Sequence, residues 1–119
     1  MSAAREAILR FFREPPRLTA EDLGILFETG GQEFFLEASE IVEITPPLPV
    51  SGLPGSPHGV AFWRGRAVEV RGVPERAHYL LLVRGRPLDF FVVSENRPAA
   101  VSRSDVPAAA LYREPHGER

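Results

Sequence analysis

The sequence lacks cysteine and lysine and has only three aspartates among its 119 residues. Without cysteine there can be no disulfide, thiolate zinc site or cysteine nucleophile, and nothing points to an oxidising compartment. No apolar run approaches the ~20 residues of a membrane-spanning helix. The N-terminus leads into no apolar signal core, so we expect a cytoplasmic protein. The net charge of −2, from 14 arginines and 16 acidic residues, lacks the broad positive field of a nucleic-acid-binding protein.

Motifs for catalysis and metal binding are also missing. The three histidines, His58, His78 and His116, lie far apart and have no zinc-ligand spacing. The sequence contains no glycine-rich phosphate loop, no serine nucleophile elbow and no His-Glu metal motif. We therefore predict a binding domain that is not an enzyme and that uses no metal or cofactor.

Twelve prolines and ten glycines favour short elements joined by frequent turns. The one helical pattern predicts a helix at residues 3–13, which ends before Pro15-Pro16. Its apolar stripe consists of Ala4, Ile8, Phe11 and Phe12. We interpret this segment as a helix that packs on its own domain, with an arm for a partner or a membrane as the alternative.

From Leu23 onward the sequence is typical of β-strands separated by turns. Apolar runs flank Gly30-Gly31, which indicates a hairpin. Arg-Gly-Arg triplets around Gly65 and Gly85 also join strand-like runs, and we interpret both as tight hairpin turns rather than RNA-binding motifs. The run after the second triplet extends from Leu88 to Val93. Five prolines at residues 46–57 predict a loop without regular structure.

These patterns predict a mostly β fold with at least five strands after residue 22, in a closed or nearly closed barrel. The expected organisation is an N-terminal helix and linker at residues 1–22, a β domain at 23–102 and a C-terminal tail at 103–119. The residues that we expect to be largely buried are Ile25, Phe27, Phe35, Ile41, Val60, Trp63, Val68, Leu81 and Phe91.

Three segments, taken in order, carry a family resemblance. The first runs from Phe27 across the Gly30-Gly31 turn to Ile41-Val42-Glu43-Ile44. The second joins a proline-containing loop to Gly59-Val60-Ala61-Phe62-Trp63-Arg64-Gly65, and the third spans residues 80–93. Together they resemble CheW-like domains, which have a Val-x-Glu-Ile-type signature, a Gly-Val-x-Asn-Leu-Arg-Gly strand end and a later hairpin at these places.

The sequence departs from the family pattern at several positions. Phe62 stands where the family usually has Asn, and Glu69 replaces the Pro of a Pro-Val-x-Asp-Leu motif. The family's last strands are largely missing, because the chain ends soon after Val101. The resemblance therefore implies a reduced, divergent member, built from CheW-like small β-barrels with an N-terminal helix.

The resemblance implies a non-catalytic signalling adaptor. Such a scaffold couples a chemoreceptor or the regulatory domain of a histidine kinase in two-component signalling, for chemotaxis or motility. The partner-binding residues that we derive from it are Glu43, Arg64, Leu48, Val50, Leu53 and Phe62. Glu43 and Arg64 match the Glu and the Arg of the two family motifs, and we predict that they lie close together beside the proline-rich loop.

Two other functions remain open from the residues alone. A strand edge left exposed by the missing strands would allow self-association, for example as a homodimer. A small nucleic-acid-binding barrel would instead hold phosphates with Arg64, Arg66, Arg84 and Arg86. Five glutamates that would repel phosphate argue against the second alternative: Glu28, Glu33, Glu37, Glu40 and Glu43.

Overall fold

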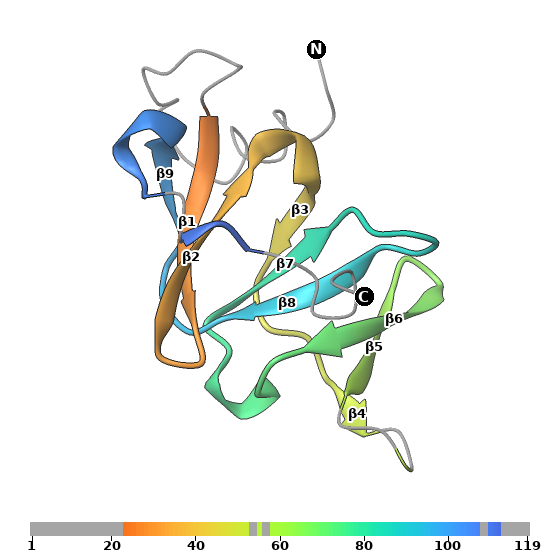
Figure 1. The fold of residues 1–119 in the computed structure, drawn as a ribbon. Helices are drawn as coiled ribbons and strands as arrows, with labels where there is room; N and C mark the ends of the chain where they lie inside the picture. The colour runs from red at the N-terminus through yellow and green to blue at the C-terminus, as the bar shows by residue number, and fades with distance from the viewer. Residues whose placement is uncertain (1–22, 53–54, 56–57, 108–109, 113–119) are drawn as a thin grey trace.

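The computed structural model describes residues 23–52, 55, 58–107 and 110–112, which form strands joined by turns and short 3₁₀ helices (Figure 1). The strands are β1 (Leu23–Thr29), β2 (Gln32–Glu37), β3 (Ile41–Thr45), β4 (Ser51–Gly52), β5 (Gly59–Trp63), β6 (Arg66–Arg71), β7 (Tyr79–Val83), β8 (Phe90–Ser94) and β9 (Ala99–Ser102). The 3₁₀ helices are η1 (Ala38–Glu40), η2 (Pro74–Arg76) and η3 (Arg103–Asp105). The predicted helix at residues 3–13, Leu53 and most of the predicted tail lie outside the described residues.

The strands form two sheets. One has the order β2-β1-β9, and the other has the order β3-β7-β8-β6-β5-β4, with β3 and β4 at its two ends. Neighbouring strands are antiparallel except for β6 and β8, which run parallel. This architecture confirms the predicted mostly β fold. One detail differs, because Ser51 and Gly52 pair with β5 inside the loop that we predicted to be irregular. Both residues keep the backbone N–H that the surrounding prolines lack.

Two of the predicted hairpin turns are confirmed. Gly30 and Gly31 join β1 to β2 with φ angles of 61° and 81°. Arg64 and Gly65 join β5 to β6 with φ angles of 52° and 84°. Positive φ at both central residues gives the backbone twist that two-residue hairpins require. Arg64 is therefore held in a left-handed conformation that costs an L-residue about 1–2 kcal/mol.

The predicted hairpin around Gly85 is confirmed, because β7 and β8 pair antiparallel on either side of it, but the tight turn that we expected there is wrong. The connection from β7 to β8 is a longer loop at residues 84–89, and Gly85 is not among the residues with positive φ. Glycine is needed there for space, since a Cβ on Gly85 would lie 2.3 Å from the backbone oxygen of Leu88. The backbone N–H of Gly85 donates to Asp89 Oδ1 at 3.2 Å, which closes the loop on itself.

β7 and β8 lie between two separate hydrophobic cores (Figure 1). Alternate side chains of β7 point to opposite faces, so Leu81 joins the first core and Leu82 joins the second. The first core also includes Leu23, Ile25, Phe27, Leu36, Ile41 and Phe90, and the second includes Ala61, Val68, Val70, Phe91 and Val93. Burial on both faces explains why β7 and β8 appear in the sequence as unbroken apolar runs.

Seven of the nine predicted core residues are buried, and Val60 and Trp63 are only half-buried. The two residues lie three apart on β5, and the two-residue period of a strand places them on opposite faces. Trp63 faces the second core, where its ring meets that of Phe91 edge to face at a centroid distance of 6.0 Å. Val60 lies on the other face. The prediction that both side chains are largely buried was therefore wrong, although half-buried Trp63 does reach the second core.

Candidate partner-binding surface

The outer face of the β5–β6 hairpin carries a large exposed aromatic side chain. Ala61 points into the second core, so its neighbour Phe62 points outward and is 75% exposed. Directly across the hairpin, Phe62 pairs with the exposed Ala67 of β6. An apolar patch on an outer face marks an interaction site when further apolar groups adjoin it.

A hollow of about 400 Å³ adjoins Ala67. It lies between β6 and the loop at residues 84–89, and its lining comprises Arg66, Ala67, Val68, Glu69, Arg71, Arg86, Pro87, Leu88 and Asp89. Leu88 is 72% exposed. Phe62 and Leu88 therefore both border the surface around Ala67, although they are separated in sequence by the whole of β6, β7 and their connections.

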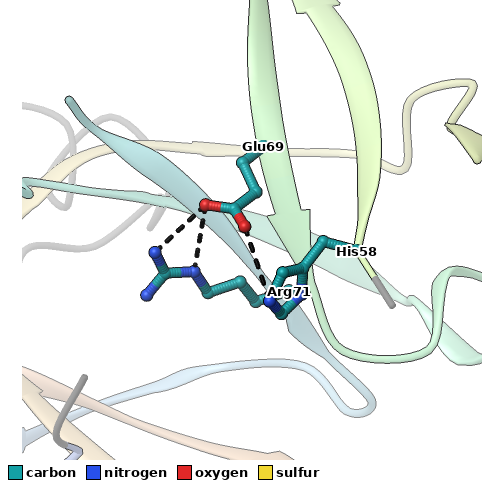
Figure 2. A network of polar contacts seen from close by, with 3 residues as sticks. All are labelled: His58, Glu69 and Arg71. Atoms are coloured by element: carbon teal, nitrogen blue, oxygen red, sulfur yellow. Dashed lines mark hydrogen bonds and ion pairs between the residues drawn. The ribbon is translucent and has the colours of Figure 1, made fainter. Parts of the chain in front are cut away.

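Glu69 is the centre of a polar network on this face (Figure 2). Arg71 Nε and Nη2 donate to Glu69 Oε1 at 3.3 and 3.0 Å, and His58 Nε2 lies 3.5 Å from Glu69 Oε2. His58 lies at the end of the proline-rich loop, two residues before Val60, and Val60 pairs with Glu69 of β6. The contact between His58 and Glu69 therefore joins the end of this loop to β6. The Arg71 guanidinium also lies 3.8 Å from the centroid of the Phe90 ring, which stabilises its position.

Two further arginines lie near the turn of the hairpin. The Arg64 guanidinium lies 4.9 Å from the Trp63 ring centroid, a cation–π contact at the exposed turn. Arg66 Nη2 lies 3.9 Å from Asp89 Oδ2, and its side chain is 58% exposed. The hairpin that carries Phe62 thus also carries two guanidinium groups near its turn, and these can donate hydrogen bonds to an acidic partner.

The predicted partner-binding residues fall in different environments. Phe62 and Arg64 are exposed on the hairpin. Leu48 and Val50 are half-buried and pack against the second core, and Val50 sits over Gly59, where an added Cβ would lie 2.4 Å from Val50 Cγ1. The proline-rich loop is therefore attached to the body of the domain next to the hairpin.

Glu43 lies half-buried on β3, opposite Leu82 of β7. In the sheet, β7, β8 and β6 separate β3 from β5, the strand that precedes Arg64. Their neighbours Val42 and Trp63 nevertheless pack against the same second core. That Glu43 and Arg64 lie close together remains a prediction.

Leu88 and the His58–Glu69–Arg71 network were not identified from the sequence, and Arg86 was named there only as a phosphate-binding candidate. Leu88 was assigned to a strand because it begins an apolar run, whereas β8 begins at Phe90. The available signal was Pro87, which interrupts strand pairing just before Leu88. Across the described part of the chain, no three histidine or acidic side chains gather closely enough to hold a metal ion. The same residues include no helix long and apolar enough to cross a membrane.

The model of the CheW-like domain matches residues 23–98, which is more than half of the chain. Comparison with curated proteins finds no match to the sequence. The matched segment runs from the first residue of β1 to the residue before β9, so it includes both hydrophobic cores and the β5–β6 hairpin. The chain therefore belongs to the CheW-like domain family.

Proposed function

We propose that this protein is a cytoplasmic, non-catalytic adaptor that couples a chemoreceptor to a histidine kinase in chemotaxis-type or motility signalling. Its family is one of coupling adaptors, and this membership is the observation that carries the proposal. The partners are the regulatory domain of the kinase, the cytoplasmic tip of the receptor, or both. Scaffolding requires only specific surfaces, and a standard contact buries about 800 Å² on each partner.

The β5–β6 hairpin is the best candidate for the first contact. Phe62 offers a large apolar anchor that is 75% exposed, and such anchors dominate the binding energy of many interfaces. Arg64 is held in place by the turn and by the Trp63 ring, so little of its freedom remains to be lost when a partner binds. Leu48, Val50 and Leu53 of the proline-rich loop, together with Glu43, complete the proposed surface.

The test uses the full chain, a purified kinase regulatory domain and a receptor tip fragment from the same genome. Binding is measured by interferometry, and kinase autophosphorylation is followed in the presence of the receptor. Phe62→Ser should weaken capture by about tenfold or more, because truncating a central anchor costs at least ~1–2 kcal/mol. Val73→Ser is the matched control, since Val73 is an exposed apolar residue outside the hairpin. Capture of neither partner, or equal capture by the wild type and Phe62→Ser, would contradict the proposal.

Self-association is a second candidate function, and one observation favours it. β9 lies at the end of its sheet, and among the described strands it pairs only with β1. Such an edge offers backbone donors and acceptors to a second chain. Gel filtration at two protein concentrations tests this function: a mass that rises with concentration supports it, and a monomer at both concentrations argues against it.

A further inference from the structure

The hollow beside β6 has the size and rigidity of a built site. Its volume of about 400 Å³ falls within the ~300–1,000 Å³ range of ligand pockets. One wall is the regular strand β6, and the other is the loop at residues 84–89. The loop is held by the hydrogen bond from Gly85 to Asp89 and by the close approach of Gly85 to Leu88. These contacts give the loop a defined conformation beside β6.

Two of the three arginines that line the hollow can still donate hydrogen bonds to a ligand. Arg71 already contacts Glu69 and the Phe90 ring, and its side chain is only 13% exposed. Asp89 accepts a hydrogen bond from the loop backbone and forms an ion pair with Arg66 at 3.9 Å, a separation longer than a direct hydrogen bond. For Arg86, which is exposed, the described residues provide no ion pair. Arg66 and Arg86 can thus donate to carboxylates of a ligand.

The hollow also has an apolar side. Leu88 and Ala67 line it, and the exposed Phe62 stands directly across the hairpin from Ala67. A ligand that fits this arrangement has an aliphatic group between two acidic groups. Three arginines and two carboxylates line the hollow, so their formal charge is only +1. This balance suits a peptide, which separates its two negative charges along the chain, better than a phosphate dianion, which concentrates them at one point near Glu69 and Asp89.

We propose that this hollow binds a short acidic peptide segment of a protein partner. An aliphatic side chain of the segment packs against Leu88 and Ala67, and flanking carboxylates accept hydrogen bonds from Arg66 and Arg86. The inference rests on the proposed function in one respect, namely that the ligand belongs to a protein that the adaptor couples. The site itself follows from the lining of the hollow.

The test titrates acetyl-Glu-Leu-Glu-amide into the full, ¹⁵N-labelled chain and follows backbone and arginine Nε–H signals by NMR. Saturable shifts are expected at Arg66, Arg86 and Leu88. Acetyl-Gln-Leu-Gln-amide and acetyl-Glu-Ser-Glu-amide should each bind at least about tenfold more weakly, because one lacks the charges and the other lacks the apolar group. Added salt should weaken binding of the acidic peptide. Inorganic phosphate that binds at the same signals as tightly as the peptide would overturn the proposal in favour of a simple anion site.

Three variants locate the binding. Arg86→Gln and Leu88→Ser should each raise the Kd for the peptide about tenfold, and both change exposed side chains. Arg76→Gln, an exposed arginine outside the lining, should leave the Kd unchanged. Thermal melting confirms that each variant is folded. Absence of saturable shifts in the wild type, or binding by Arg86→Gln and Leu88→Ser as tight as that of the wild type, would overturn the proposal.

The outcome is separable from that of the proposed function. If the kinase domain or receptor tip is captured but the peptide does not bind, the proposed function stands and this site is refuted. If the peptide binds but neither partner is captured, the site stands and the coupling function is refuted.

Discussion

Phe27→Ala should destabilise the domain by roughly 3–5 kcal/mol, which is the usual cost of truncating a buried Phe. Phe27 is fully buried at the centre of the first core, on β1. Its ring lies 6.2 Å from that of Phe34 and 5.9 Å from that of Tyr112, measured between centroids. The substitution removes both contacts and leaves a cavity between rigid strands. The loss is a large part of the ~5–15 kcal/mol that stabilises a typical domain.

The assay is urea denaturation followed by circular dichroism. With an m-value of about 2 kcal/mol/M, a loss of about 4 kcal/mol lowers the unfolding midpoint by about 2 M. Phe27→Leu retains most of the apolar volume and should cost less than about 1.5 kcal/mol. The order wild type, Phe27→Leu, Phe27→Ala is therefore expected. An unchanged midpoint for Phe27→Ala, or equal losses for both variants, would refute the assignment of Phe27 to a tightly packed core.

Three further predictions address the turns, the hairpin and the N-terminus. Gly85→Ala should destabilise by about 1–3 kcal/mol in the same urea assay, because its Cβ collides with loop backbone; a loss of less than about 0.5 kcal/mol would show that the loop adjusts freely. Arg64→Ala and Arg64→Lys should both lose partner capture while the melting temperature changes little, since an exposed charge contributes only ~0–1 kcal/mol to folding. Full capture by both variants would show that Arg64 is not part of the partner-binding surface. If the predicted helix packs on the domain, deleting residues 1–16 should expose apolar surface and cause aggregation, which light scattering detects. A truncated protein with the solubility and stability of the full chain would show that the helix is a free arm.

Strands and two-residue turns could be predicted from the sequence because their causes are local. Alternation of apolar and polar residues follows from the strand period, and Gly30-Gly31 supplies the positive φ that a two-residue turn needs. Phe62 and Arg64 could be identified as site candidates from a motif of adjacent residues. The order of such motifs along the chain was also enough to indicate the family.

Tertiary structure decided which conformation each of the two Arg-Gly-Arg triplets adopts. The triplets themselves are identical, and only Pro87 after the second one hints at a difference. In the structure Gly65 makes a tight turn and Gly85 packs against Leu88 in a longer loop. The hollow beside β6 likewise depends on the pairing of β6 with β8, which brings the loop at residues 84–89 next to a strand far from it in sequence. No local period encodes a contact of this kind, because it arises only when strands from distant parts of the chain share one sheet.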